Sequence, residues 1–166
     1  MEERRSREKI IPLEIYTDGS LKKIGKKTFG AWGFIAVRDD KEFYRASGVE
    51  YDTTNQRMEL LGAIKGVQYA SQARRPSEKV ILYCDSAYII NCYREEWYLK
   101  WLENGWINSQ KKSVANIDLW EQLIPYFDNF WYYFDKIKGH AGNYWNETCD
   151  ELVQREAQSL KNNWRG

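Results

Sequence analysis

The sequence predicts one mixed α/β domain, in which a five-stranded mixed sheet is covered by helices on both faces, in the order β-β-β-α-β-α-β-α. Three observations predict it. Three strand patterns come first, strand and helix patterns then alternate, and the 166 residues, 43% of them hydrophobic, suffice for one core. We expect the domain to span residues 10–166 and the charged segment 1–9 to be flexible.

The first half of the chain is predicted to form a three-stranded meander followed by a helix. Strands are expected over 10–17, 29–37 and 41–48, and the first of these is expected to end at Asp18-Gly19. From residue 55 to about residue 73, apolar side chains recur at helical spacing, which predicts a long amphipathic helix. The pair Arg75-Pro76 follows it as a helix breaker.

The second half alternates between strand and helix. The short apolar run 79–84 is typical of a buried parallel strand. A helix is expected from Asp85-Ser86 to about residue 103, with Gly105 as its stop, and a second helix over 116–128. The aromatic run 130–137 predicts the fifth strand, and Asn146 is expected to cap a last helix.

Four carboxylates are the candidate catalytic groups: Asp18, Glu59, Asp85 and Asp150. Each has an ordinary explanation when taken singly, as a turn residue, a helix cap or a first-turn acid. Together they follow two strands and begin two helices, and sites in such sheets form beyond the carboxyl ends of parallel strands. Converging carboxylates repel one another unless cations are present, and Mg²⁺ prefers such oxygen ligands. Two such ions can clamp the attacking and leaving oxygens of a phosphodiester.

A strip of small residues supports this convergence. Gly62, Ala63 and Gly66 share the helical face of Glu59. Another backbone could therefore approach this helix closely.

Four motifs resemble those of type 1 ribonuclease H, in matching order and spacing from residue 11 to about residue 160: TDGS (17–20), TTNQRMEL (53–60), CDSAY (84–88) and KGHAGNYWNETCDEL (138–152). The resemblance implies the ribonuclease H-like fold and an endonuclease that hydrolyses the RNA strand of RNA–DNA hybrids. It implies a two-metal-ion mechanism that leaves 5′-phosphate and 3′-hydroxyl ends, with two Mg²⁺ ions bound alongside substrate and Mn²⁺ able to substitute.

The resemblance also assigns catalytic roles by position. Asp18 would bridge the two ions, while Glu59, Asp85 and Asp150 would complete their ligation, Glu59 lying also close to a ribose 2′-hydroxyl. His140, the only histidine, matches the family's mobile histidine, which assists in activating water or releasing product.

Substrate contacts are implied for six further residues. Asn55 and Gln56 match a pair that reaches the minor groove, where amides can both donate to and accept from 2′-hydroxyls and base edges. From the residues alone, Asn55 could be a helix N-cap, and it could serve in both roles. Gly19 and Ser86 match positions near the RNA strand, Thr54 one that contacts a DNA phosphate, and Trp97 one in the protruding handle that grips the DNA strand.

The handle departs from the family pattern. Its tryptophans are Trp97, Trp101, Trp106 and Trp120, of which we expect Trp101 and Trp120 to be packing. Basic residues Arg94, Lys100, Lys111 and Lys112 are offset by Glu95, Glu96 and Glu103. Because phosphate neutralisation dominates affinity, we expect weak or salt-sensitive hybrid binding, compensated in part by a basic loop at Lys22, Lys23, Lys26 and Lys27.

Other interpretations remain open: a catalytically silent hybrid- or duplex-binding module of the same fold, a DNA nuclease of the same fold, or a domain of a reverse transcriptase. Met1 favours a standalone protein, and we expect no N-terminal hybrid-binding domain. The charged N-terminus, the absence of a long apolar run and three cysteines without metal-site spacing favour a cytoplasmic protein with reduced thiols that does not bind membranes. We also expect a monomer.

Overall fold

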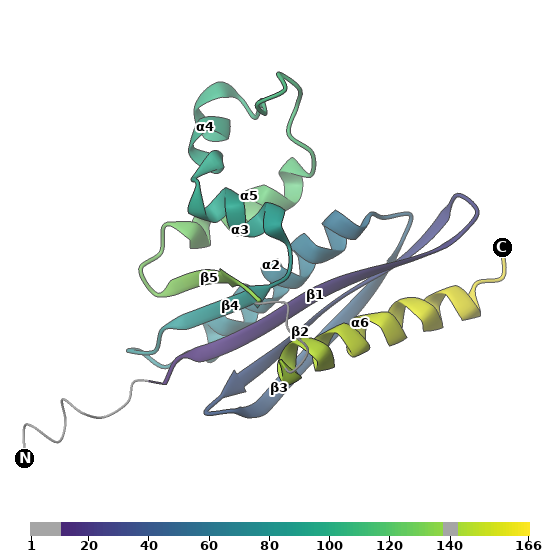
Figure 1. Cartoon of the computed structure of the whole chain (residues 1–166), viewed down its shortest axis with the longest axis horizontal. Coiled ribbons are helices and arrows are strands. Elements are labelled where there is room, and N and C mark those ends of the chain that lie inside the picture. The colour runs from purple at the N-terminus through teal and green to yellow at the C-terminus, as the bar shows by residue number, and fades with distance from the viewer. Residues whose placement is uncertain (1–10, 138–142) are drawn as a thin grey trace, which may run out of the picture.

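The computed structural model describes residues 11–137 and 143–166, so the expected flexible segment 1–9 and His140 lie outside the described residues. Figure 1 shows a sheet with helices packed against it, from which a smaller helical part projects at the top of the view.

The predicted five-stranded mixed sheet is confirmed. Its strand order is β3-β2-β1-β4-β5. β1 pairs antiparallel with β2 and β2 with β3, whereas β1–β4 and β4–β5 are parallel. The strands are β1 (Leu13–Ile24), β2 (Lys27–Arg38), β3 (Lys41–Tyr51), β4 (Val80–Cys84) and β5 (Tyr132–Lys136).

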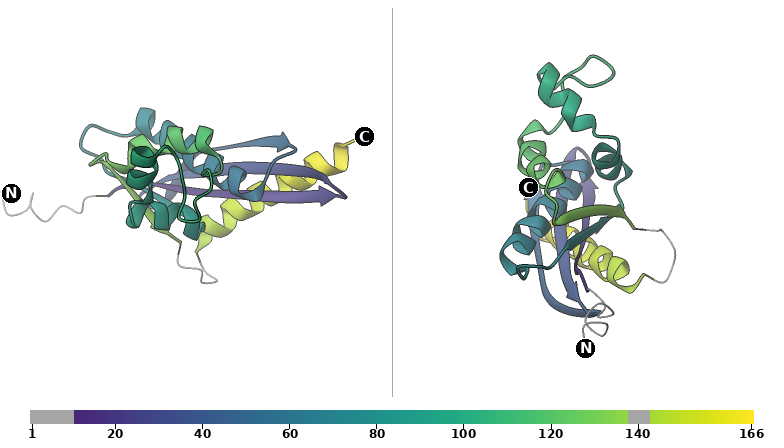
Figure 2. Two further views of the ribbon diagram at one scale, coloured as in Figure 1. Left: turned by 90° about the horizontal axis from the view of Figure 1, so that it is seen from above. Right: turned by 90° about the vertical axis from the view of Figure 1, so that its left-hand side faces the viewer.

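Helices cover both faces, as expected (Figure 2). Successive strand residues point to opposite faces, and Phe34 belongs to a core that includes residues of α2, α3 and α5, whereas Ile35 packs in a separate core with Cys149 of α6. Helices α2, α3 and α5 therefore lie on one face, α4 joins the same core through Tyr98 and Trp101, and α6 lies on the other face. The helices are α2 (Asn55–Ala73), α3 (Ala87–Arg94), α4 (Trp97–Asn104), α5 (Ile117–Phe127) and α6 (Tyr144–Asn163).

The expected end of the first strand at Asp18-Gly19 was wrong. β1 continues to Ile24, because β2 pairs with it along its whole length, with Asp18 opposite Gly33. What ends near Asp18 is the parallel pairing with β4, whose last pair is Tyr16 with Tyr83. Asp18 is therefore held in extended backbone at a strand edge rather than in a turn.

The single helix expected over 85–103 is two helices. Glu96 adopts a left-handed conformation, with φ of 57°, so α3 ends before it and α4 begins after it. The break redirects the chain so that α4 buries Tyr98 and Trp101. Gly105, at φ 79°, ends α4 as expected.

Two expected helix caps lie elsewhere. The cap of α2 is Thr54, whose hydroxyl accepts a hydrogen bond from the Arg57 amide, and Asn55 is the first helical residue. The cap of α6 is Asn143, whose side chain accepts from the amide of Asn146. The expected cap at Asn146 was therefore wrong by three residues, because Asn146 lies in the first turn of the helix and Asn143 precedes it.

None of the described helices combines the length and apolar character needed to cross a membrane. The three cysteines are buried free thiols.

Candidate active site

Asp18 and Asp85 each lie two residues beyond the last residue pair of the parallel strands β1 and β4. Asp18 follows Tyr16 by two residues and Asp85 follows Tyr83 by two, and these tyrosines form the last pair between β1 and β4. Because β4 ends at Cys84 while β1 continues, the edge of β1 becomes free at this point. The two acids therefore flank a gap at the carboxyl end of the parallel strands.

Close packing of α2 brings Glu59 to this gap. A Cβ on Gly19 would lie 2.6 Å from the amide nitrogen of Glu59, and a Cβ on Gly62 would lie 2.8 Å from the carbonyl oxygen of Asp18. A Cβ on Gly66 would lie 2.7 Å from Ile15. The close approach predicted from the small residues of α2 is thus present, and Gly19 supplies its counterpart on the strand.

α6 brings Asp150 from the opposite face. Cys149 is buried, and its thiol donates to the carbonyl oxygens of Tyr16 and Gly33 at 3.5 and 3.6 Å. A Cβ on Gly33 would meet Val153 at 2.9 Å, so this helix also packs tightly. Asp150 follows Cys149 directly and interacts electrostatically with Asp18.

A shallow niche lies between β1, α2 and the end of β4. Three of the four predicted acids line it, namely Asp18, Glu59 and Asp85, together with Ser86. Thr17 and Cys84 also line it and were not singled out from the sequence, although each directly precedes a predicted acid. Adjacency to those acids along the two strands was the signal that could have found them.

Burial and like charge shape the electrostatics of Asp18. The pKa of Asp18 is raised to about 7, mainly by burial and also by Asp150 and Glu59, while a hydrogen bond of 2.8 Å from the Gly19 amide opposes the shift. Such a carboxyl group keeps its proton in a pH range where an exposed aspartate is ionised.

Burial likewise raises the pKa of Glu59, and the charge of Asp85 adds to the effect, while hydrogen bonds from Ser86 and Asn55 oppose it. The bond from Asn55 is 3.1 Å long. Electrostatic interactions thus link Asp150 to Asp18, Asp18 to Glu59, and Glu59 to Asp85. Within 11–137 and 143–166, no three Asp, Glu, Cys or His side chains stand together as a ready-made cation site.

The first turn of α2 is tied to α5, a connection that the sequence did not reveal. Arg57 donates to both carboxylate oxygens of Asp118, at 3.0 and 2.9 Å, and to Asn116 at 3.2 Å. Asn116 in turn donates to the side-chain oxygen of Gln56 at 3.0 Å. About sixty residues separate the partners, so no local pattern could have indicated them. Thr54 and Asn55 are exposed beside this network.

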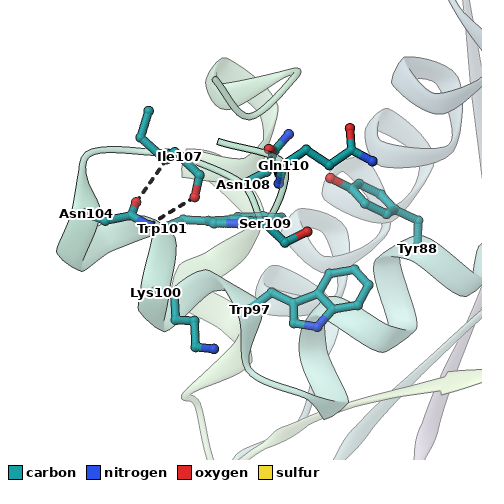
Figure 3. A pocket seen from close by; sticks show the side chains of 9 residues that line it. All are labelled: Tyr88, Trp97, Lys100, Trp101, Asn104, Ile107, Asn108, Ser109 and Gln110. Carbon is teal, nitrogen blue, oxygen red and sulfur yellow. Dashed lines mark hydrogen bonds between the residues drawn. The ribbon is translucent and has the colours of Figure 1, made fainter. Parts of the chain in front are cut away.

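A cavity lies in the predicted handle, and none of the four carboxylates lines it. It has a volume of about 450 Å³ and is lined by Tyr88, Trp97, Trp101 and polar residues that include Lys100 and Gln110. Figure 3 shows these aromatic rings around the opening. Asn104 closes one side by exchanging hydrogen bonds of 2.9 and 3.0 Å with the backbone of Ile107 (Figure 3).

The expected division among the handle tryptophans is confirmed for the packing residues. Trp101 is 5% exposed and Trp120 is fully buried. Trp97 is only half-buried and its ring contacts that of Tyr88. His140, the remaining predicted catalytic residue, lies outside the described residues.

Comparisons with known proteins match this architecture. The family model RNase H matches residues 11–158. The Ribonuclease H of Syntrophomonas wolfei is 40% identical over 146 residues, which are 88% of this chain and 96% of that protein.

Two solved structures share the fold. LC9-RNase H1, a type 1 RNase H with the type 2 active-site motif, has a TM-score of 0.69 at 22% identity, over 92% of this chain and 74% of that one. The foamy viral protease–reverse transcriptase in complex with an RNA/DNA hybrid has a TM-score of 0.73 at 20% identity, over 91% of this chain and 20% of that one. With its sequence matched over most of its length and its fold shared with these structures, the chain belongs to the ribonuclease H family.

Proposed function

We propose that this ribonuclease H is an endonuclease that cuts the RNA strand of RNA–DNA hybrids with the aid of divalent cations, leaving 5′-phosphate and 3′-hydroxyl ends. One observation carries the proposal. Asp18 and Asp85 flank the gap beyond the parallel strands at equal offsets, while Glu59 and Asp150 approach from helices on opposite faces. We place the catalytic unit in residues 10–166.

The donor set fits hard divalent cations. The four acids offer only oxygen ligands, as Mg²⁺ prefers, and Mn²⁺ can take the same ligands. Burial is the main cause that raises the pKa of Asp18, and the charges of Asp150 and Glu59 add to it, so bound cations would favour the ionised carboxylate. Asp18, Glu59, Asp85 and Asp150 would hold two ions with substrate, and those ions would supply Lewis-acid stabilisation of the phosphodiester oxygens.

The remaining polar groups would orient the substrate. Asn55 and Gln56 stand at the start of α2, where their amides can recognise sugar hydroxyls and base edges. Gln56 is already oriented by Asn116. Gly19 and Ser86 would approach the RNA strand beside the acids through backbone or hydroxyl groups, Thr54 would contact a DNA phosphate, and Trp97 would contact the DNA strand in the handle.

His140 would assist and not hold the cations. An imidazole titrates near neutral pH, so it can accept and return a proton during attack by water and product release. We further propose that the protein acts as a monomer in the cytoplasm.

A strand-labelled assay tests the proposal. RNA–DNA, RNA–RNA and DNA–DNA duplexes of one sequence are incubated with the protein, either with Mg²⁺ or with a chelator. We expect cleavage only of the RNA strand of the hybrid and only with Mg²⁺, and products whose 5′ ends accept label only after phosphatase treatment. Cleavage of DNA–DNA would favour a DNA nuclease, and hybrid binding without cleavage would favour a silent module.

Asp18→Asn provides the matched variant. The amide keeps the size of the side chain and can still accept from the Gly19 amide, but it removes the proposed bridging charge. We expect cleavage to be lost while hybrid binding and folding persist. Full activity in this variant would refute the bridging role.

A further inference from the structure

The strand that carries Asp18 continues into a lysine-rich hairpin. β1 runs on to Ile24 and returns as β2 from Lys27, and Figure 1 shows the two strands projecting beyond the rest of the sheet at this end. We call its four cations, Lys22, Lys23, Lys26 and Lys27, the lysine hairpin.

Three of these four cations have no partner of opposite charge among the described residues. Lys27 forms an ion pair of 3.0 Å with Asp52 and lies over the rings of Tyr51 and Trp164. Lys22, Lys23 and Lys26 make no salt bridge or side-chain hydrogen bond with any part of the chain that the structure describes. Their charges are therefore available to an external anion.

The hairpin is held firmly relative to the proposed active site. Phe29, in β2, is fully buried, with its ring edge-on to those of Tyr51 and Trp164. Thr28 donates its hydroxyl to the carbonyl of Thr53 and accepts from the Thr53 amide, both at 2.9 Å. Since α2 begins two residues later and carries Glu59, the lysines keep a fixed position relative to the acids.

Strand geometry places these lysines at a useful distance from Asp18. Lys22 lies four residues beyond Asp18 and points to the same face, whereas Lys23 points to the face of Gly19. At about 3.3 Å per residue, the two lysines lie roughly 13–17 Å from Asp18 along the strand. That distance corresponds to about four or five base pairs at roughly 3.4 Å each.

The handle offers less free positive charge. Residues 94–112 contain four basic and three acidic residues, whereas residues 22–27 contain four basic and none acidic. Arg94 is also paired with Asp135. Of these two segments, the lysine hairpin is the more electropositive.

We propose that the lysine hairpin binds the sugar–phosphate backbone of the hybrid, about four or five base pairs from the cleavage site, and supplies an anchor that the nearly neutral handle does not. This inference rests on the proposed function, because it takes the carboxylate niche as the place of cleavage. The free edge of β1 beyond Thr17 gives the backbone a path from the niche to the lysines.

Hybrid binding at several salt concentrations tests this contact. Lys22→Gln/Lys23→Gln is compared with Lys41→Gln/Lys79→Gln, each in a chain that also carries Asp18→Asn to prevent cleavage. The control removes the same charge from one exposed and one half-buried lysine, and both lie at the opposite end of the sheet, where Leu13 pairs with Arg38. Thermal unfolding confirms that both variants are folded.

We expect the slope of log affinity against log salt concentration to become shallower by about 1.4–1.8 in the hairpin variant. Each lost phosphate contact reduces the magnitude of this slope by roughly 0.7–0.9. The control slope should not change. The parent is the chain that carries Asp18→Asn alone. An unchanged slope in the hairpin variant relative to this parent, or an equal reduction of the slope in the hairpin variant and the control variant, would overturn the proposal.

Trimmed hybrids locate the contact. Hybrids that extend only two base pairs beyond the cleavage site on one side or on the other are tested in turn. We expect trimming on one side to abolish the difference between hairpin variant and parent, and trimming on the other side to preserve it. A difference insensitive to both trims would overturn the assigned position.

Cleavage by chains with Asp18 intact separates this inference from the proposed function. The hairpin substitutions should raise KM with little change in kcat. If the parent cut no hybrid while the change in salt slope persisted, the proposed function would fail and the phosphate contact would stand.

Discussion

Replacing Asp18 with asparagine should stabilise the protein when divalent cations are removed. Burial is the main cause that raises the pKa of Asp18 to about 7 from its ordinary 3.8. Between these values the folded protein holds a proton that the unfolded chain releases, so the free energy of unfolding falls as pH rises. Asparagine does not ionise and avoids this loss.

The structure sets the size of the effect. A pKa difference of about 3 units corresponds to about 4 kcal/mol at 1.36 kcal/mol per unit. This figure is an upper limit. Side-chain movement can lower the cost of ionising Asp18, and part of that cost comes from the interaction with Asp150. We expect Asp18→Asn to gain about 1–4 kcal/mol at pH 8.5, and to gain little at pH 4, where the folded carboxyl group is protonated and the unfolded one is only about half ionised.

Urea unfolding in a chelating buffer between pH 4 and 8.5 measures this difference, with Asp39→Asn as control. Asp39 is exposed, and asparagine tolerates its positive φ of 52°. The stabilisation by Asp18→Asn should increase with pH, whereas the control should stay near zero. A constant difference across this range, or destabilisation at pH 8.5, would refute the account of a strained carboxylate. Added Mg²⁺ should stabilise only the chain that retains Asp18.

Three further predictions concern the surroundings of the acids. Gly62→Ala gains about 1 kcal/mol of helix propensity but places a methyl group against the Asp18 carbonyl. We therefore expect urea unfolding to show a net loss of stability of up to about 2 kcal/mol, and cleavage to show a lower kcat. Unchanged stability and activity would contradict the close approach. Asp118→Asn should cost about 0.5–1 kcal/mol at neutral pH, because its ion pair with Arg57 is largely exposed, and the cost should shrink in high salt; a salt-independent cost would contradict this reasoning. His140→Ala should slow turnover in the hybrid cleavage assay far less than Asp18→Asn, and an equal loss would contradict an assisting role.

Periodicity and turn residues were sufficient to predict the sheet and its order along the chain. The short apolar run at β4 predicted a parallel strand. The Gly62–Gly66 strip predicted that another backbone would approach α2 closely, and the structure shows that this backbone is β1. Local patterns succeed there because buried strands and close-packed helices constrain residue type over a few positions.

Errors arose where distant residues decide local structure. Asp18-Gly19 reads as a turn, but pairing with β2 carries β1 to Ile24. Glu96 in a left-handed conformation splits a helix that its sequence would continue, and burial of Trp101 accompanies the new direction. The tie from Arg57 to Asp118 joins segments far apart in the chain, which no window of residues contains.

Calorimetric titration of Mg²⁺ into the protein tests most directly whether the acids act together. The account predicts saturable binding to the unaltered chain, its loss in Asp18→Asn and its retention in Asp39→Asn. Equal binding by all three proteins would contradict the claim that this niche holds the cations.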